Sequence, residues 1–119
     1  LLCNLLSYQN CVNSKNHFFF DNSSAFYANY NWNIQDLVNM NKFVQSRIND
    51  IYVGIDLFPR HKSHFHEDFI KSKSELFTLA RRFNMSVVFF AIGYFYEVLD
   101  RKDFYDNFSS FWSNLSPSL

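Results

Sequence analysis

Glycine, proline and cysteine each occur only twice in the 119 residues. With Gly54 and Gly93 as the two glycines, neither phosphate-binding motif, GxGxxG or GxxxxGK[ST], is possible. Cys3 and Cys11 are too few and too close in sequence for a disulfide framework, and two thiols suit a reducing compartment. The sequence therefore disfavours a nucleotide-cradling sheet and a disulfide-stabilised domain.

The chain also has no excess of positive or negative charge. Eleven basic and eleven acidic residues give a formal net charge of +0, and the basic residues form no stripe. Nucleic-acid binding by phosphate neutralisation is disfavoured. The longest apolar run, residues 87–96, is about half of the roughly 20 residues that a membrane helix needs, so no membrane partner is expected. No motif predicts a cofactor.

Aromatic residues, in contrast, are abundant: the chain has 16 Phe, 7 Tyr and 2 Trp. Many of them must lie in the core, and the remainder are available to line a pocket. Three apolar runs, residues 25–28, 51–55 and 86–92, predict short strands buried on both faces.

Helical patterns stand between and around these strands. A weak helix is predicted over residues 1–17, and a second from an N-cap at Asn33, supported by Asp36, to about Asn49. Ser72 and Glu75 have capping-box spacing at the start of a third helix, which should stop at residue 84. A last helix begins near residue 103, and Gly93 is expected to allow a sharp exit from the third strand.

Alternation of strands and helices predicts an α/β fold with parallel strands and right-handed crossovers. About three consecutive βα units do not close on themselves. They are either part of a (β/α)8 TIM barrel or a slice of an open doubly wound sheet, and the missing phosphate motifs favour the barrel. The chain begins with Leu and an apolar LLCNLL segment, so residues 1–119 are expected to form a single partial domain of a larger protein.

Polar and aromatic residues follow each predicted strand, where parallel sheets bind their ligands. They are Asn29, Tyr30 and Trp32 after the first strand, Asp56 and Arg60 after the second, and Tyr94, Tyr96 and Glu97 after the third. Rings beside amides and carboxylates are typical of a carbohydrate site.

From the residues alone, Asp56 and Glu97 are candidates for a glycosidase acid/base pair. The structural alternative is that Asp56 pairs with Arg60 and that Glu97 caps the last helix. Tyr30 and Trp32 are equally compatible with core packing.

Three histidines, His61, His64 and His66, lie in the predicted connection after the second strand. Their HxxHxH spacing matches no familiar helix-face metal site, so a solvated loop is favoured and no metal site is predicted. No motif supports a serine or cysteine nucleophile.

Four stretches carry a resemblance: YQNCVNSKNHFFFDNSSAFYANYNW, IYVGIDLFPR, SVVFFAIGYFYE and RKDFYDNFSSFW. In order and spacing they resemble the later part of the catalytic barrel of cytosolic endo-β-N-acetylglucosaminidases, glycoside hydrolase family 85. NYNW and VGIDLF together are specific to that pattern.

The resemblance implies a retaining hydrolase that cuts the GlcNAc-β1,4-GlcNAc chitobiose core of N-glycans, on oligosaccharides or glycoproteins in the cytosol. It implies that the 2-acetamido oxygen of the substrate is the nucleophile and that an Asn-x-Glu pair supplies the general acid/base. That pair is expected upstream of residue 1, so Asp56 and Glu97 lose the acid/base role and the isolated chain should be inactive. The implied substrate-binding residues are Tyr8, Asn29, Tyr30, Trp32, Asp56, Arg60, Tyr94, Tyr96 and Glu97.

Departures from the family pattern leave other interpretations open. Tyr8 and Tyr94 replace tryptophans, Pro59 replaces a glycine, Ile92 replaces a proline, and HKSHFHED replaces a glycine-rich loop. One alternative is a divergent, non-catalytic relative that at most binds glycans. Another is an unrelated α/β regulatory domain whose strand-end aromatics serve packing.

Overall fold

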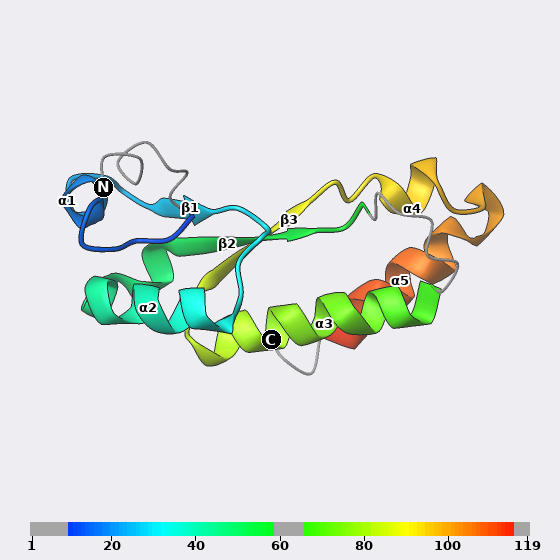
Figure 1. The fold of residues 1–119 in the computed structure, drawn as a ribbon. Coiled ribbons are helices and arrows are strands. Elements are labelled where there is room, and N and C mark those ends of the chain that lie inside the picture. Colours follow the sequence, from blue (N-terminus) through cyan, green and yellow to red (C-terminus); the bar gives the residue numbers. More distant parts are fainter. Residues whose placement is uncertain (1–9, 59–65, 116–119) are drawn as a thin grey trace.

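Three strands alternate with helices in the computed structural model, which describes residues 10–58 and 66–115 (Figure 1). The strands are β1 (Phe26–Ala28), β2 (Ile51–Asp56) and β3 (Ser86–Phe90). The helical segments are α1 (His17–Asp21), α2 (Ile34–Val44), η2 (Gln45–Asp50), α3 (His66–Arg82), α4 (Tyr94–Glu97), η3 (Arg101–Asp103) and α5 (Phe104–Leu115).

The strands form one parallel sheet in the order β1-β2-β3, as predicted. Ala28 lies opposite Val53, and Asp56 at the end of β2 lies opposite Phe90 at the end of β3. All three carboxyl ends therefore meet at one edge, which we call the strand-end edge. The α/β alternation is confirmed within the described residues.

Helices α2, α3 and α5 lie on one side of the sheet (Figure 1). Side chains that point to that side are buried, among them Ala28, Val53 and Ile55. The opposite side, here called the open face, carries side chains that are largely exposed: Tyr27 (48%), Tyr52 (40%), Val88 (37%) and Phe90 (50%). Helices of the described chain cover only one face of the sheet, so burial of the strands on both faces stays a prediction for a larger protein that supplies the second layer.

Helix α2 begins as its sequence predicts. The Asn33 side-chain oxygen accepts hydrogen bonds from the N–H groups of Gln35 and Asp36, and the Asp36 carboxylate accepts one from the Asn33 N–H. This reciprocal cap satisfies N–H groups that the first turn leaves unpaired. Leu37 and Met40 carry its buried face.

The α-helical part ends at Val44, earlier than the predicted stop at Asn49, and continues as the 3-10 segment η2. Within η2, Arg47 leaves the helical conformation (φ −99°, ψ 24°). Its guanidinium donates to the carbonyl oxygens of Phe20, Ser23 and Ser24, which lie in and after α1. These tertiary contacts accompany the kink and were not visible in the local pattern.

Helix α3 starts at His66, so the predicted capping box at Ser72 is wrong. No glycine or proline lies between residues 66 and 82, and the helix therefore extends a full turn and more before Ser72. Its end is as predicted: Asn84 adopts a left-handed conformation (φ 56°). The Met85 N–H donates to the Ala80 carbonyl, which completes a Schellman-type cap.

The chain leaves β3 through Ala91, which has a positive φ of 60°. Gly93 was expected to provide that turn, but its φ is −58°. Asp100 accepts a hydrogen bond from the Lys102 N–H at the start of η3, so Asp100, and not Glu97, caps the segment that leads into α5. Phe111 and Leu115 bury the apolar side of α5, as predicted.

The predicted N-terminal helix over residues 1–17 is not found in its described part, since residues 10–16 are irregular and α1 starts at His17. Across the described ranges, no helix has the length and apolarity needed to cross a bilayer.

Candidate functional site at the strand-end edge

Tyr30 lies in the loop that leaves β1 and stacks on Phe90, the last residue of β3. Their ring centroids are 6.1 Å apart with an interplanar angle of 24°. Because β2 lies between β1 and β3, the loop must cross the end of β2, and Asp56 is the register partner of Phe90 there. The structure thus brings together Tyr30 and Asp56, which sequence analysis named, with Phe90, which it missed.

Asn29 is held by a side chain that sequence analysis did not single out. The Asn29 N–H donates to the side-chain oxygen of Asn10 at 2.6 Å, and the Asn10 amide nitrogen donates to the Asn29 carbonyl at 3.1 Å. The Asn29 side-chain oxygen accepts from the Tyr30 N–H at 2.8 Å. Asn10 therefore extends the pairing of β1 beyond Ala28 and anchors the loop that carries Tyr30.

Asp56 ends β2 with its carboxylate turned back on its own loop, where one oxygen accepts a hydrogen bond from the Phe58 N–H at 2.9 Å. Lys73 of α3 is close enough to interact electrostatically with Asp56. Partial burial lowers the pKa of the Lys73 ammonium, and the negative charge of Asp56 acts in the opposite direction. Sequence analysis did not single out Lys73.

Trp32 is buried, with 7% of its surface exposed. Its indole N–H donates to the Gly54 carbonyl oxygen at 2.7 Å. The pairing of β1 with β2 ends at Ala28 and Val53. The Trp32 indole N–H therefore donates to β2 at a point where β1 no longer pairs with it. In this structure Trp32 supports the strand-end edge from within the core.

Tyr94 is also buried, at 6% exposed, and packs edge-to-face on Phe58 with centroids 5.8 Å apart. Burial raises the pKa of its phenol. This contact joins the segment after β2 to α4, so the strand-end edge continues from one strand to the next.

Tyr96 and Glu97 are exposed on α4. The Arg101 guanidinium lies 4.8 Å from the Tyr96 ring centroid, and Phe104 packs edge-to-face against the same ring. A Cβ atom placed on Gly93 would lie 2.5 Å from a Glu97 carboxylate oxygen, so Gly93 leaves room for that side chain.

Several predicted positions lie outside the described residues: Tyr8, Arg60, His61 and His64. His66 is the first residue of α3. Among the residues that the structure describes, no group of three or more His, Cys, Asp or Glu side chains is arranged to hold a metal ion.

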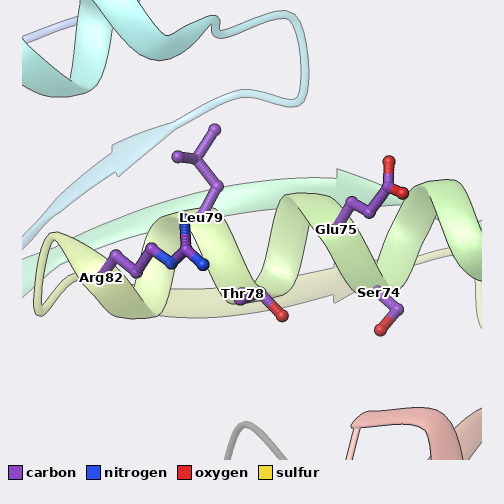
Figure 2. A pocket seen from close by; sticks show the side chains of 5 residues that line it. All are labelled: Ser74, Glu75, Thr78, Leu79 and Arg82. Atoms are coloured by element: carbon purple, nitrogen blue, oxygen red, sulfur yellow. The ribbon is translucent and has the colours of Figure 1, made fainter.

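A shallow hollow of about 330 Å³ lies along α3, lined by Ser74, Glu75, Thr78, Leu79 and Arg82. Figure 2 shows that all five side chains come from this one helix. None of the five is among the residues of the strand-end edge described above, so we do not assign the hollow to the candidate site. Stacking rings, amides and one carboxylate at the strand-end edge suit hydrogen bonding and ring stacking with a sugar.

Comparison with known proteins decides the family. The sequence matches "Glycosyl hydrolase family 85" over residues 3–118. The chain belongs to this family. That membership overturns the interpretation as an unrelated α/β regulatory domain.

Curated proteins similar to this chain are identical to it at more than a third of the aligned residues. The chain is 39% identical to a cytosolic endo-beta-N-acetylglucosaminidase of Danio rerio over 119 residues, covering 96% of this chain and 16% of that protein. It is 36% identical to the Homo sapiens protein of that name and 37% identical to that of Mus musculus, each over 117 residues, covering 96% of this chain and 15% of theirs. The chain thus spans about a sixth of the length of these relatives. No solved structure matches significantly.

Proposed function

We propose that the protein carrying this chain is a cytosolic endo-β-N-acetylglucosaminidase that hydrolyses the GlcNAc-β1,4-GlcNAc bond of the N-glycan chitobiose core. The family match over residues 3–118 carries the proposal, and the names of the relatives support both the activity and the compartment. Its partners are N-glycan oligosaccharides or glycoproteins.

The proposed reaction is retaining and substrate-assisted. The 2-acetamido oxygen of the substrate attacks the anomeric carbon, while a Glu donates a proton to the departing GlcNAc oxygen and an Asn orients the acetamido group. We place that Asn-x-Glu pair upstream of residue 1. This chain then contributes substrate-binding walls, for which Tyr30 and Asp56 at the strand-end edge are the best supported candidates.

We further propose that residues 1–119 form part of a (β/α)8 barrel. Parallel strands with helices on one face and exposed side chains on the other are the arrangement of a barrel wall. The radius of gyration is 16.4 Å, whereas a compact domain of this length would have about 13.5 Å. The open face supports a barrel interior whose remaining strands lie elsewhere in the protein.

A second candidate is a non-catalytic relative that at most binds glycans. The departures from the family pattern favour it, notably Tyr94 in place of a tryptophan and Pro59 in place of a glycine.

The test is an assay of the protein encoded by the complete open reading frame. Incubation with a high-mannose glycopeptide should release a glycan that ends in a single GlcNAc, detected by mass spectrometry. Replacing the Glu of an upstream Asn-x-Glu by Gln is the control and should abolish release. A complete protein that binds the glycan without cleaving it would support the second candidate, and the isolated 119-residue chain should release nothing.

A further inference from the structure

The position of Tyr30 depends on the lack of a side chain in β2 at Gly54. Tyr30 follows β1, and its stacking partner Phe90 ends β3, so the contact passes over β2. In Figure 1 the loop after β1 crosses β2 before it turns down into α2. Side chains alternate along a strand, so positions 54 and 56 of β2 lie on the open face near this crossing. These positions are occupied by Gly54 and Asp56.

Gly54 keeps the crossing open. A Cβ atom at this position would lie 3.2 Å from the Tyr30 backbone nitrogen and 2.5 Å from the Tyr27 phenol oxygen. The first contact is with backbone, which has little freedom to move away. Gly54 is not needed for a positive φ, so its role here is space for the loop and for the Tyr27 ring.

Phe90 provides the surface on which Tyr30 rests. Its ring is half exposed, and a separation of 6.1 Å with nearly parallel planes is an offset stack. Asp56, the register partner of Phe90, lies beside this pair and is tied to the Phe58 N–H. The ring of Tyr30 therefore has a defined place on Phe90, whose register partner at the strand-end edge is Asp56.

We infer that Phe90 and Gly54 are positioning residues that set the pose of Tyr30 as a sugar-facing wall. Phe90 fixes the plane of the Tyr30 ring by stacking, and Gly54 admits the loop that carries it across β2. This inference rests on the proposed function, because it takes Tyr30 to contact the glycan.

The experiment uses the complete protein with one fluorotyrosine introduced at position 30. Phe90→Leu removes the aromatic ring but keeps an apolar side chain, Phe90→Tyr keeps the ring, and Val88→Ala is a control two residues earlier on the same face. Each variant keeps an apolar or aromatic side chain at its position, so we expect it to fold, and circular dichroism checks this. Phe90→Leu should shift the fluorine resonance of residue 30 and lower kcat/KM for the glycopeptide about three- to tenfold.

Phe90→Tyr should restore kcat/KM to within about twofold of the wild-type value. Val88→Ala should leave the resonance unchanged, and Gly54→Ala should move it in the same sense as a loss of stacking. A wild-type resonance and rate in Phe90→Leu, or an equal loss in Phe90→Tyr, would overturn the inference while the hydrolase activity stands. If the wild-type protein neither cleaves nor binds the glycan, the proposed function itself fails, and the sugar-facing role of Tyr30 fails with it.

Discussion

The indole nitrogen of Trp32 and the carbonyl oxygen of Gly54 are joined by a 2.7 Å hydrogen bond between the β1–α2 connection and β2. Both residues are buried, so no water competes for this contact. The bond continues the pairing of the sheet where β1 has ended.

Trp32→Phe should lower the free energy of unfolding by about 1–3 kcal/mol, because it leaves the buried Gly54 carbonyl unpaired. Urea unfolding measures the change. Trp112→Phe is the matched control: this tryptophan is 38% exposed and contacts its neighbours through ring packing. An equal loss in the two variants would show that ring size, and not the hydrogen bond, is responsible.

Arg47 is a second stabilising residue, since its guanidinium contacts three carbonyl oxygens, the Asp50 carboxylate and the Phe20 ring. Arg47→Ala should cost about 2 kcal/mol or more, because hydrogen bonds to a charged group are among the stronger ones. Thermal unfolding measures this loss.

The control for Arg47 is Lys102→Ala, which removes an ion pair with Asp100 that lies on the surface. Such pairs contribute about 0–1 kcal/mol. If Lys102→Ala destabilised the protein as much as Arg47→Ala, the importance we give to the backbone contacts of Arg47 would be refuted.

Asn84 ends α3 in the left-handed region, with φ 56°. Asn84→Ala should destabilise the fold by about 1 kcal/mol, because a Cβ-bearing residue without a local polar side chain is strained there. Asn84→Gly should stay within about 0.5 kcal/mol of the wild type, since glycine adopts this conformation freely. Urea unfolding distinguishes the two, and an equal effect of both variants would argue against conformational strain.

Cys11 should react slowly with iodoacetamide in a Cys3→Ser background. Burial raises the pKa of its thiol, a hydrogen bond with the Asn13 side chain opposes this, and the negative charge of Asp36 adds a smaller increase. The thiolate is the reactive form, so the midpoint of the rate–pH profile should lie above that of a free cysteine. Because the folded pKa is raised, the protonated thiol contributes stability below the unfolded pKa that is lost as pH rises through the folded value.

The midpoint of this profile does not depend on how accessible the sulfur is, whereas the plateau rate does. Asp36→Asn should therefore lower the midpoint by removing a nearby negative charge. A midpoint at or below that of a free cysteine would contradict the prediction.

The isolated 119-residue chain should associate in solution, because Tyr27, Tyr52, Val88 and Phe90 are exposed on its open face and no helix within residues 10–58 and 66–115 covers them. Size-exclusion chromatography and binding of a hydrophobic dye measure this. Val88→Thr and Phe90→Thr together should reduce association. A monomer that binds no dye would argue against the proposed barrel interior.

Local sequence determined where most elements of this protein lie. The apolar run that forms β2, the cap at Asn33 and the left-handed stop at Asn84 depend on neighbours within a few residues, and each is found where it was predicted. Ser72 failed as a helix start because capping-box spacing is a weak signal inside a segment without helix breakers.

Tertiary structure alone decided which of these residues meet. Trp32 turns into the core, Tyr30 crosses β2 to reach Phe90, and Arg47 holds the end of α1, although each partner lies more than twenty residues away in the chain. Local periodicity indicates that a side chain is apolar or polar, but not which strand will lie beside it. The register of the parallel sheet and the coverage of only one face settle that, so the sequence named the candidates and the fold selected their neighbours.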